Sequence, residues 1–191
     1  MEILIEHLAR NLREQLALEE DIYRNIKSKI DLIDEIEYAD ARHLLSQTCL
    51  VLEKQFKPLN ESVDKLEESS FADPSLTYHS NGSDHDILSA AAKRQGKISR
   101  ILQDAYLALN GVTISNTALH TTALALDAHD IAHLALKQLQ NLAPLVVQIG
   151  RLMPEVIARE LHKESANIDI SIAQQALKNV QLAWKKTELP N

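Results

Sequence analysis

Glu19 is the side chain whose type and position most clearly suggest chemistry. Steps of seven residues along the N-terminal segment pass through Ile5, Leu12, Glu19, Ile26 and Ile33. A carboxylate therefore stands on an otherwise apolar line, the face that a helix turns toward a core. A glutamate that projects into a helical bundle can bind a metal ion when other helices supply further ligands. It can also stay partly exposed or pair with a nearby Lys, Arg or Tyr, and the sequence leaves both interpretations open.

Asp40 and His43 form a second candidate pair on the next predicted helix. They stand three residues apart, a spacing that lets a carboxylate and an imidazole approach one ion from the same helix face. The helical phase, however, places His43 nearly opposite the apolar stripe that contains Leu45 and Cys49. We therefore expect His43 to face solvent unless another helix or subunit covers that side.

The segment DAHDIAH holds the densest group of metal-ligating residue types in the chain: Asp127, His129, Asp130 and His133. The two histidines are four residues apart and could share a divalent ion. By helical phase they point away from the apolar seam, as does the Asp130/His133 pair, whereas Asp127 and His120 lie closer to it. In the alternative interpretation, Asp127 caps a helix, forms a salt bridge or faces solvent, and the histidines form a polar outer face.

The composition predicts that helices position these residues. The chain has 191 residues, of which 45% are hydrophobic and 4% aromatic, and it contains only 4 Gly and 5 Pro. Few residues therefore interrupt long stretches of Ala, Leu, Glu, Gln and Lys, which favour helix. We predict one all-α domain covering residues 1–191, an antiparallel four-helix bundle with additional C-terminal helices.

The hydrophobic spacing and the turn residues divide the chain into segments. Helices are predicted over about residues 2–28 or 2–30, from 34 to at least 57, and over 84–110, 112–143 and 167–186. Pro58 either ends the second helix or lies in the first turn of a short continuation. Asn110-Gly111 marks the end of the third, and Ser83 or Asp84 caps its start. Between the last two, Pro144 and Pro154 predict either two short helices or one kinked helix.

A polar segment at residues 69–86 has no apolar period and predicts the one long loop. It stands where an up-down-down-up bundle needs its crossover connection. A flexible linker between two helical hairpins would have the same composition.

The charge and cysteine content bear on partners and location. The formal net charge is −7, and no Lys/Arg cluster could neutralise a row of phosphates, so nucleic-acid binding is disfavoured. No apolar run reaches the roughly 20 residues needed to span a bilayer. The single Cys49 cannot form an internal disulfide, and the N-terminus has charges where a signal peptide would be apolar. These features predict a protein of the cytoplasm with no membrane or nucleic-acid partner.

The placement of Glu19 in the first helix, followed by DARHLLSQTCLVLEKQF in the second, resembles the ferritin-like superfamily and loosely its YciF-like stress-protein branch. His43, Thr48 and Leu52 echo the second helix of that branch. DAHDIAH resembles its later acidic segment, with Asp127 and Asp130 in place of glutamates. The resemblance implies a four-helix bundle that is often dimeric and sometimes holds a di-iron or di-manganese centre. Such centres use Glu-x-x-His twice, whereas this chain has Asp-x-x-His, which leaves an altered or lost centre as the alternative.

Two functions are consistent with these observations. In the first, Glu19 and Asp127, helped by His120 or His43, hold iron or manganese in a ferritin-like bundle that supports stress protection. In the second, the chain is a non-enzymatic scaffold or interaction protein without a metal site, and its nearly all-round apolar fourth helix contacts a second copy in a homodimer or another partner. No motif assigns a substrate or a reaction.

Overall fold

The computed structural model describes residues 2–69 and 97–185. Within these ranges the chain forms helices and no strand, which confirms the prediction of an all-α protein there. The helices are α1 (Glu2–Ile30), α2 (Ala39–Ser69), α4 (Ile98–Ala125), α5 (His129–Glu164) and α6 (Ile172–Lys185). None of these helices is long and apolar enough to cross a membrane.

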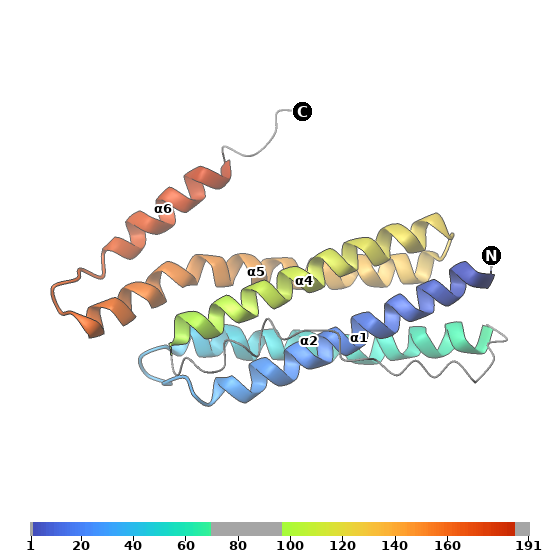
Figure 1. The fold of residues 1–191 in the computed structure, drawn as a ribbon, viewed down its shortest axis with the longest axis horizontal. Coiled ribbons are helices and arrows are strands. Elements are labelled where there is room, and N and C mark those ends of the chain that lie inside the picture. Colours follow the sequence, from blue (N-terminus) through green and yellow to red (C-terminus); the bar gives the residue numbers. More distant parts are fainter. Residues whose placement is uncertain (1, 70–96, 186–191) are drawn as a thin grey trace.

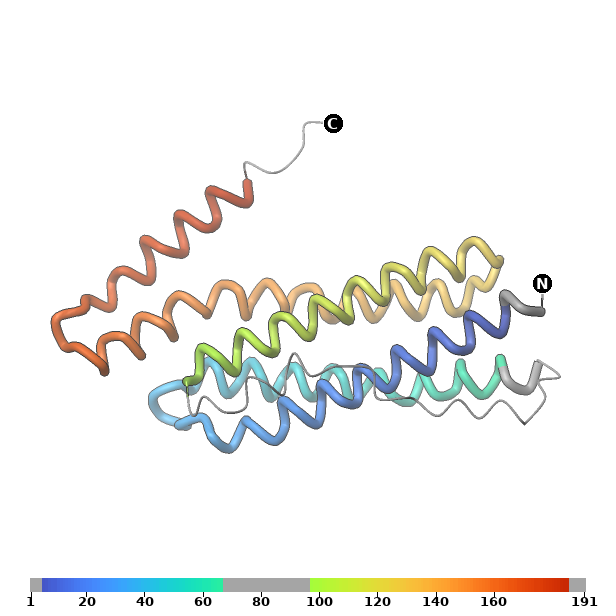
Figure 2. The backbone as a smooth tube through the Cα atoms, viewed as in Figure 1, coloured from blue at the N-terminus to red at the C-terminus, as the bar shows by residue number. Residues whose placement is uncertain are grey.

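Helices α1, α2, α4 and α5 lie side by side, and α6 diverges from them (Figure 1). α1 packs against α2 and α4, while α5 packs against α2, α4 and α6. Following the chain in Figure 2, α1 and α2 run in opposite directions, as do α4 and α5, whereas α2 and α4 run the same way. Each of the four long helices thus has two close neighbours and can contribute side chains to one shared interior.

The buried positions on these helices recur in alternating steps of three and four residues. On α4 these steps connect Ile98, Leu102, Ala105, Leu109, Val112, Asn116, Leu119 and Ala123, and Asp104 beside them is also buried. On α5 the same steps connect Ile131, Ala135, Gln138, Leu142, Leu145 and Ile149. An average repeat of 3.5 residues keeps one stripe facing a neighbouring helix over many turns. This repeat explains why helices of such length stay in contact from end to end.

The core divides into two apolar clusters along the helix axes. The loop-side cluster lies toward the α1–α2 loop and includes Ile22, Ile26, Leu45, Leu52, Leu102, Leu109, Val112, Leu142, Leu145 and Ile149. The turn-side cluster lies toward the α4–α5 turn and consists of Leu8, Leu12, Leu59, Val63, Leu119, Ala123, Ile131, Ala132 and Ala135. Every one of the four long helices contributes to both clusters, so the level between them is also shared by four helices.

The predicted helix end at Asn110-Gly111 is wrong, because α4 continues to Ala125. Gly111 is exposed, and a Cβ added there would meet nothing within 4 Å. A glycine in an exposed helix costs roughly 1 kcal/mol relative to alanine. Full burial of Leu109 and Val112 on either side, worth about 1.5–3 kcal/mol each, outweighs that cost. The chain turns instead between α4 and α5, within the predicted helix 112–143.

The prolines in the C-terminal part of the chain do not divide its long helix. α5 is one helix that contains both Pro144 and Pro154, so the segment after Pro144 is not divided into two short helices. The predicted helix end at residue 143 is wrong, because α5 already includes residues 129–143. α2 likewise contains Pro58. A proline removes one hydrogen bond of the helix, yet Pro144 is flanked by two buried residues, Leu142 and Leu145, which are 0% and 2% exposed. Packing on both sides therefore holds the helix together across it.

Two predicted features fall on residues that the structure does not describe. The loop at 69–86 lies outside the described residues apart from Ser69, and so does the predicted cap at Ser83 or Asp84. The described part of α4 begins at Ile98, and its first turn is bound by α5. Glu160 accepts hydrogen bonds from the backbone N–H of Ser99 at 2.9 Å and from its hydroxyl at 2.5 Å. This carboxylate satisfies a free backbone donor at the helix N-terminus.

Candidate functional site

A layer of polar side chains crosses the interior between the two apolar clusters. It consists of Gln15, Glu19, Gln55, Asn116 and Gln138, each at most 4% exposed, and we call it the polar layer. α1 contributes the first two, and α2, α4 and α5 contribute one each. Buried polar residues normally have hydrogen-bond partners. A whole layer of them at one level is therefore the most unusual feature of the core.

The heptad pattern explains why these residues meet. On each helix the polar residue stands between a member of the turn-side cluster and a member of the loop-side cluster. The flanking pairs are Leu12 and Ile22 on α1, Leu59 and Leu52 on α2, Leu119 and Val112 on α4, and Ala135 and Leu142 on α5. Polar residues thus occupy core positions of the repeat on four helices, and the chain reversals bring them to the same level.

Glu19 is the only ionisable residue of the layer. It is 0% exposed, and the side-chain amide of Gln15 donates a hydrogen bond of 2.7 Å to its Oε1. Burial raises the pKa of Glu19 to about 7, against a smaller opposing effect of the nearby amides of Gln15 and Asn116. The Asn116 amide is close enough to favour the charged form, although it is not in hydrogen-bonding geometry. Glu19 therefore takes up or releases a proton near neutral pH.

Many polar atoms of the layer lack a hydrogen-bond partner within the described chain. They are Oε1 of Gln15, Oε2 of Glu19 and both side-chain polar atoms of Gln55, Asn116 and Gln138. A buried polar group without a partner costs about 1–3 kcal/mol. Thr48 is also fully buried, but its hydroxyl donates to the carbonyl of Leu44 at 2.8 Å. The layer is thus expensive for stability, and some other property must favour it.

Asp127 and His120 lie at the α4–α5 turn, away from the polar layer. Asp127 is exposed and has a φ of 54°, so it belongs to neither helix. His120 is half-buried, and its Nδ1 lies 2.8 Å from the carbonyl oxygen of Ala132. That bond joins the end of α4 to the start of α5. The turn-side cluster, with Leu12, Leu119 and Ala135, stands between these two residues and Glu19.

The remaining candidate ligands lie on the surface. Asp40 and His43 are exposed on α2, as the helical phase predicts for His43, and Asp40 lies 3.9 Å from Arg159 in a salt bridge. Asp130 and His133 are exposed near the start of α5. Among the described residues, no three His, Cys, Asp or Glu side chains come together in a group that could hold a metal ion.

Cys49 belongs to the loop-side cluster and is 7% exposed. Burial raises the pKa of its thiol to about 11. The protonated thiol is a poor nucleophile. Cys49 therefore packs as a small apolar residue, as its place in the apolar stripe of α2 predicts.

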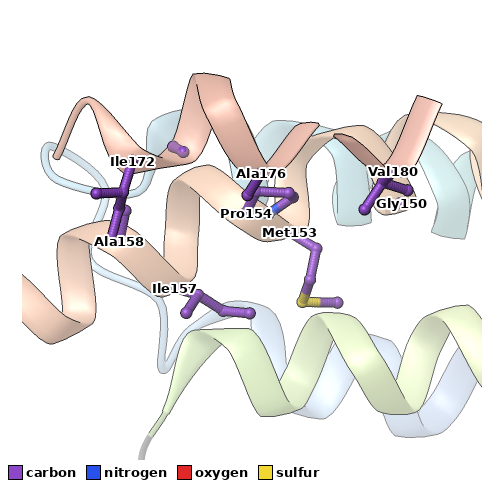
Figure 3. A pocket seen from close by; sticks show the side chains of 9 residues that line it. Gly150, Met153, Pro154, Ile157, Ala158, Ile172, Ala176 and Val180 are labelled. Carbon is purple, nitrogen blue, oxygen red and sulfur yellow. The ribbon is translucent and has the colours of Figure 1, made fainter. Parts of the chain in front are cut away.

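An apolar groove of about 330 Å³ lies between α5 and α6 (Figure 3). Its lining residues are Gly150, Met153, Pro154, Ile157, Ala158, Ile172, Ala173, Ala176 and Val180. None of these side chains is ionisable, so the groove offers apolar contact and no acid–base group. It contains no residue of the polar layer.

The turn allows a test of what Asp127 does. Its φ lies in the left-handed region, which glycine adopts freely and alanine only at a cost of about 1–2 kcal/mol. We expect Asp127→Ala to lower the free energy of unfolding by about 1 kcal/mol and Asp127→Gly to leave it unchanged or slightly higher. Urea unfolding of both variants measures this. Equal losses in both would mean that the carboxylate, and not the backbone, matters at this position.

The polar layer contains three residues that the sequence analysis missed: Gln55, Asn116 and Gln138. Each stands at a core position between buried apolar residues three steps away on one side and four on the other. That spacing was a usable signal on α2 and α5. On α4 the predicted break at Asn110-Gly111 concealed it. Comparisons with protein-family models, with curated proteins and with solved structures find no match to this chain.

Proposed function

We propose that the four long helices form an antiparallel four-helix bundle with the connectivity of the ferritin-like superfamily. The directions of the helices support this, because α1 and α2 are opposed, α4 and α5 are opposed, and α2 and α4 run the same way (Figure 2). The neighbours also agree, since α1 contacts α4 and α5 contacts α2. In that superfamily a crossover connects the second and third bundle helices.

The donor set of the polar layer does not fit a di-iron or di-manganese centre. Such a centre takes a Glu from each of two helices and a Glu-x-x-His pair from each of the other two. The layer offers one carboxylate, four carboxamides and no imidazole. Two divalent ions would bring four positive charges against a single negative one into a buried site, at a large desolvation cost. We therefore assign no reaction step to a metal there.

We propose instead that the protein is a non-enzymatic interaction protein that binds through its helical surface. One observation carries this: α4 has no Asp, Glu, Lys or Arg between Asp104 and Asp127, and its outer face exposes Leu107 by 53% and Ile114 by 71%. An apolar strip along an exposed helix is typical of an interaction site. The chain as a whole has 25% charged residues and a net charge of −7, so a strip without any charge stands out from its surroundings.

The polar layer has a structural role in this proposal. Apolar stripes with a regular heptad can slide past one another with little loss of packing, whereas a buried polar residue at a core position specifies one register. Any shift of a helix would place Gln55, Asn116 or Gln138 within an apolar cluster. The layer would thus fix the surface geometry at some expense in stability.

Elemental analysis of the native protein and of Glu19→Leu tests this function. We expect neither iron nor manganese at stoichiometric level, and we expect Glu19→Leu to fold and to gain stability at pH 8, because the leucine removes a buried carboxylate. Glu19→Gln is the control that keeps a polar side chain of the same size. Iron or manganese that copurifies with the native protein and is lost in Glu19→Leu would overturn the proposal.

A further inference from the structure

A second heptad line runs along α4 on the face opposite its core stripe. It consists of Leu107, Gly111, Ile114, Ala118, Thr121 and Ala125, and we call it the outer seam. All six residues are exposed, and none carries a charge. The steps alternate between four and three residues, as they do on the buried side of α4. A helix with two such lines is suited to contacting helices on two sides.

We propose that the outer seam is a homodimer interface in which α4 of one copy packs antiparallel against α4 of a second copy, with the two-fold axis at the level of Asn116. This proposal deepens the proposed function, since it names the partner of the apolar strip. A two-fold interface uses the same patch on both copies, so the patch must be complementary to itself.

The order of side chains along the seam meets that requirement. In the antiparallel arrangement, residues whose numbers are equally far from 116 lie opposite each other. The pairs are Leu107 with Ala125 of the second copy, Gly111 with Thr121, and Ile114 with Ala118. Each pair combines a larger and a smaller side chain. Such pairing lets two helices approach closely and interdigitate, as knobs do in the holes of a coiled coil.

The space and the charges along the outer seam are compatible with a second copy of this chain. An added Cβ at Gly111 would meet nothing within 4 Å, so a side chain of the partner can enter there. Each copy carries a formal net charge of −7, and two copies repel each other over most of their surface. From Ala105 to Leu126 the chain has no Asp, Glu, Lys or Arg. Two acidic copies can therefore meet along this strip with little local repulsion.

Sedimentation velocity of the full chain between about 1 and 300 µM tests the interface. One pair of helices buries less area than a standard interface, so we expect a monomer–dimer equilibrium with a dissociation constant of about 1–100 µM. Ile114→Lys should weaken the dimer at least tenfold, because it buries an unpaired charge. Leu50→Lys, at a residue 56% exposed on α2, is the matched control and should leave the dimer intact. A native chain that stays monomeric at 300 µM, or a dimer unaffected by Ile114→Lys, would overturn the proposal.

A charge-rescue experiment tests the antiparallel pairing. Ala118→Glu alone should also weaken the dimer at least tenfold. When the Ile114→Lys and Ala118→Glu variants are mixed, the antiparallel arrangement places the introduced lysine beside the introduced glutamate, and the mixed dimer should form at least tenfold more tightly than either variant with itself. Because both positions are exposed in the single chain, neither substitution should unfold it. No gain on mixing would exclude this pairing.

The two proposals fail in different ways. A monomeric native protein without bound metal removes the dimer and leaves an interaction protein with another partner. Iron or manganese bound through Glu19 removes the proposed function, whatever the oligomeric state.

Discussion

When the pH rises from 5 to 8, the free energy of unfolding of Glu19→Gln should increase by about 3 kcal/mol relative to that of the native sequence. The side chain is fully buried, and burial raises its pKa from an ordinary 4.5 to about 7. The folded protein therefore holds this proton more tightly than the unfolded chain does. The contribution of Glu19 to stability is most favourable when both states are protonated, below about pH 4.5, and is lost as pH rises through 7. Well above pH 7, where the carboxyl is ionised in both states, the loss stays constant.

The direction of this effect follows from the surroundings of Glu19. The other members of the polar layer, Gln15, Gln55, Asn116 and Gln138, are buried on the four long helices, and none of them titrates or carries a charge. No cation in the layer can stabilise the carboxylate, so desolvation dominates. Glutamine keeps the size and the hydrogen-bonding capacity of the side chain but cannot ionise. The variant should therefore lack this part of the pH dependence.

Urea unfolding of both proteins at pH 5, 6, 7 and 8 and at one protein concentration measures the difference. Other ionisable groups are common to both and cancel. Glu14→Gln on the same helix is the control, because its carboxylate is 63% exposed and should show almost no such difference. Parallel stability curves for Glu19→Gln and the native sequence would mean that something compensates the buried charge, and the account of the polar layer would then fail.

The first helix shows how much of the site could be predicted from sequence. Steps of seven residues identified the apolar line and placed Glu19 on it, and the structure buries this line from Leu12 to Ile33. The depth of burial and the composition of the layer were not predictable in the same way. They depend on which levels of α2, α4 and α5 lie beside Glu19, and the chain reversals set those levels. As long as the levels of the neighbouring helices are unknown, Asn116 or Gln138 is only a single polar residue in an apolar stripe.

The α4–α5 turn shows where local signals misled. The sequence predicts a helix end at Gly111 and a helical position for Asp127. In the structure, α4 passes through Gly111, and the chain turns at Asp127. Propensity counts against glycine within a helix, but the packing of the neighbouring residues decided the outcome. No glycine or proline marks the real turn, where an aspartate adopts the left-handed conformation that it tolerates better than most residues. Because the chain turns at Asp127, this residue is exposed and does not lie beside the core stripe as predicted.

Leu109→Ala and Leu107→Ala should differ by about 2–4 kcal/mol in their effect on the free energy of unfolding, although the two leucines are only two residues apart on α4. Leu109 is 0% exposed and packs in the loop-side cluster, whereas Leu107 is 53% exposed on the outer seam. Removal of three buried carbon atoms leaves a cavity and typically costs 2–5 kcal/mol. The exposed leucine loses little surface burial, and alanine slightly favours the helix.

This comparison should be made in the Ile114→Lys background, where the proposed dimer is weakened and unfolding reports on the single chain. Urea unfolding then measures the two faces of α4 separately. Comparable losses from both substitutions in that background would mean that the outer seam is covered within one chain, and the proposed interface could not exist. A large loss for Leu109→Ala alone, together with a concentration-dependent loss for Leu107→Ala in the native background, would assign one face of α4 to the core and the other to the second copy.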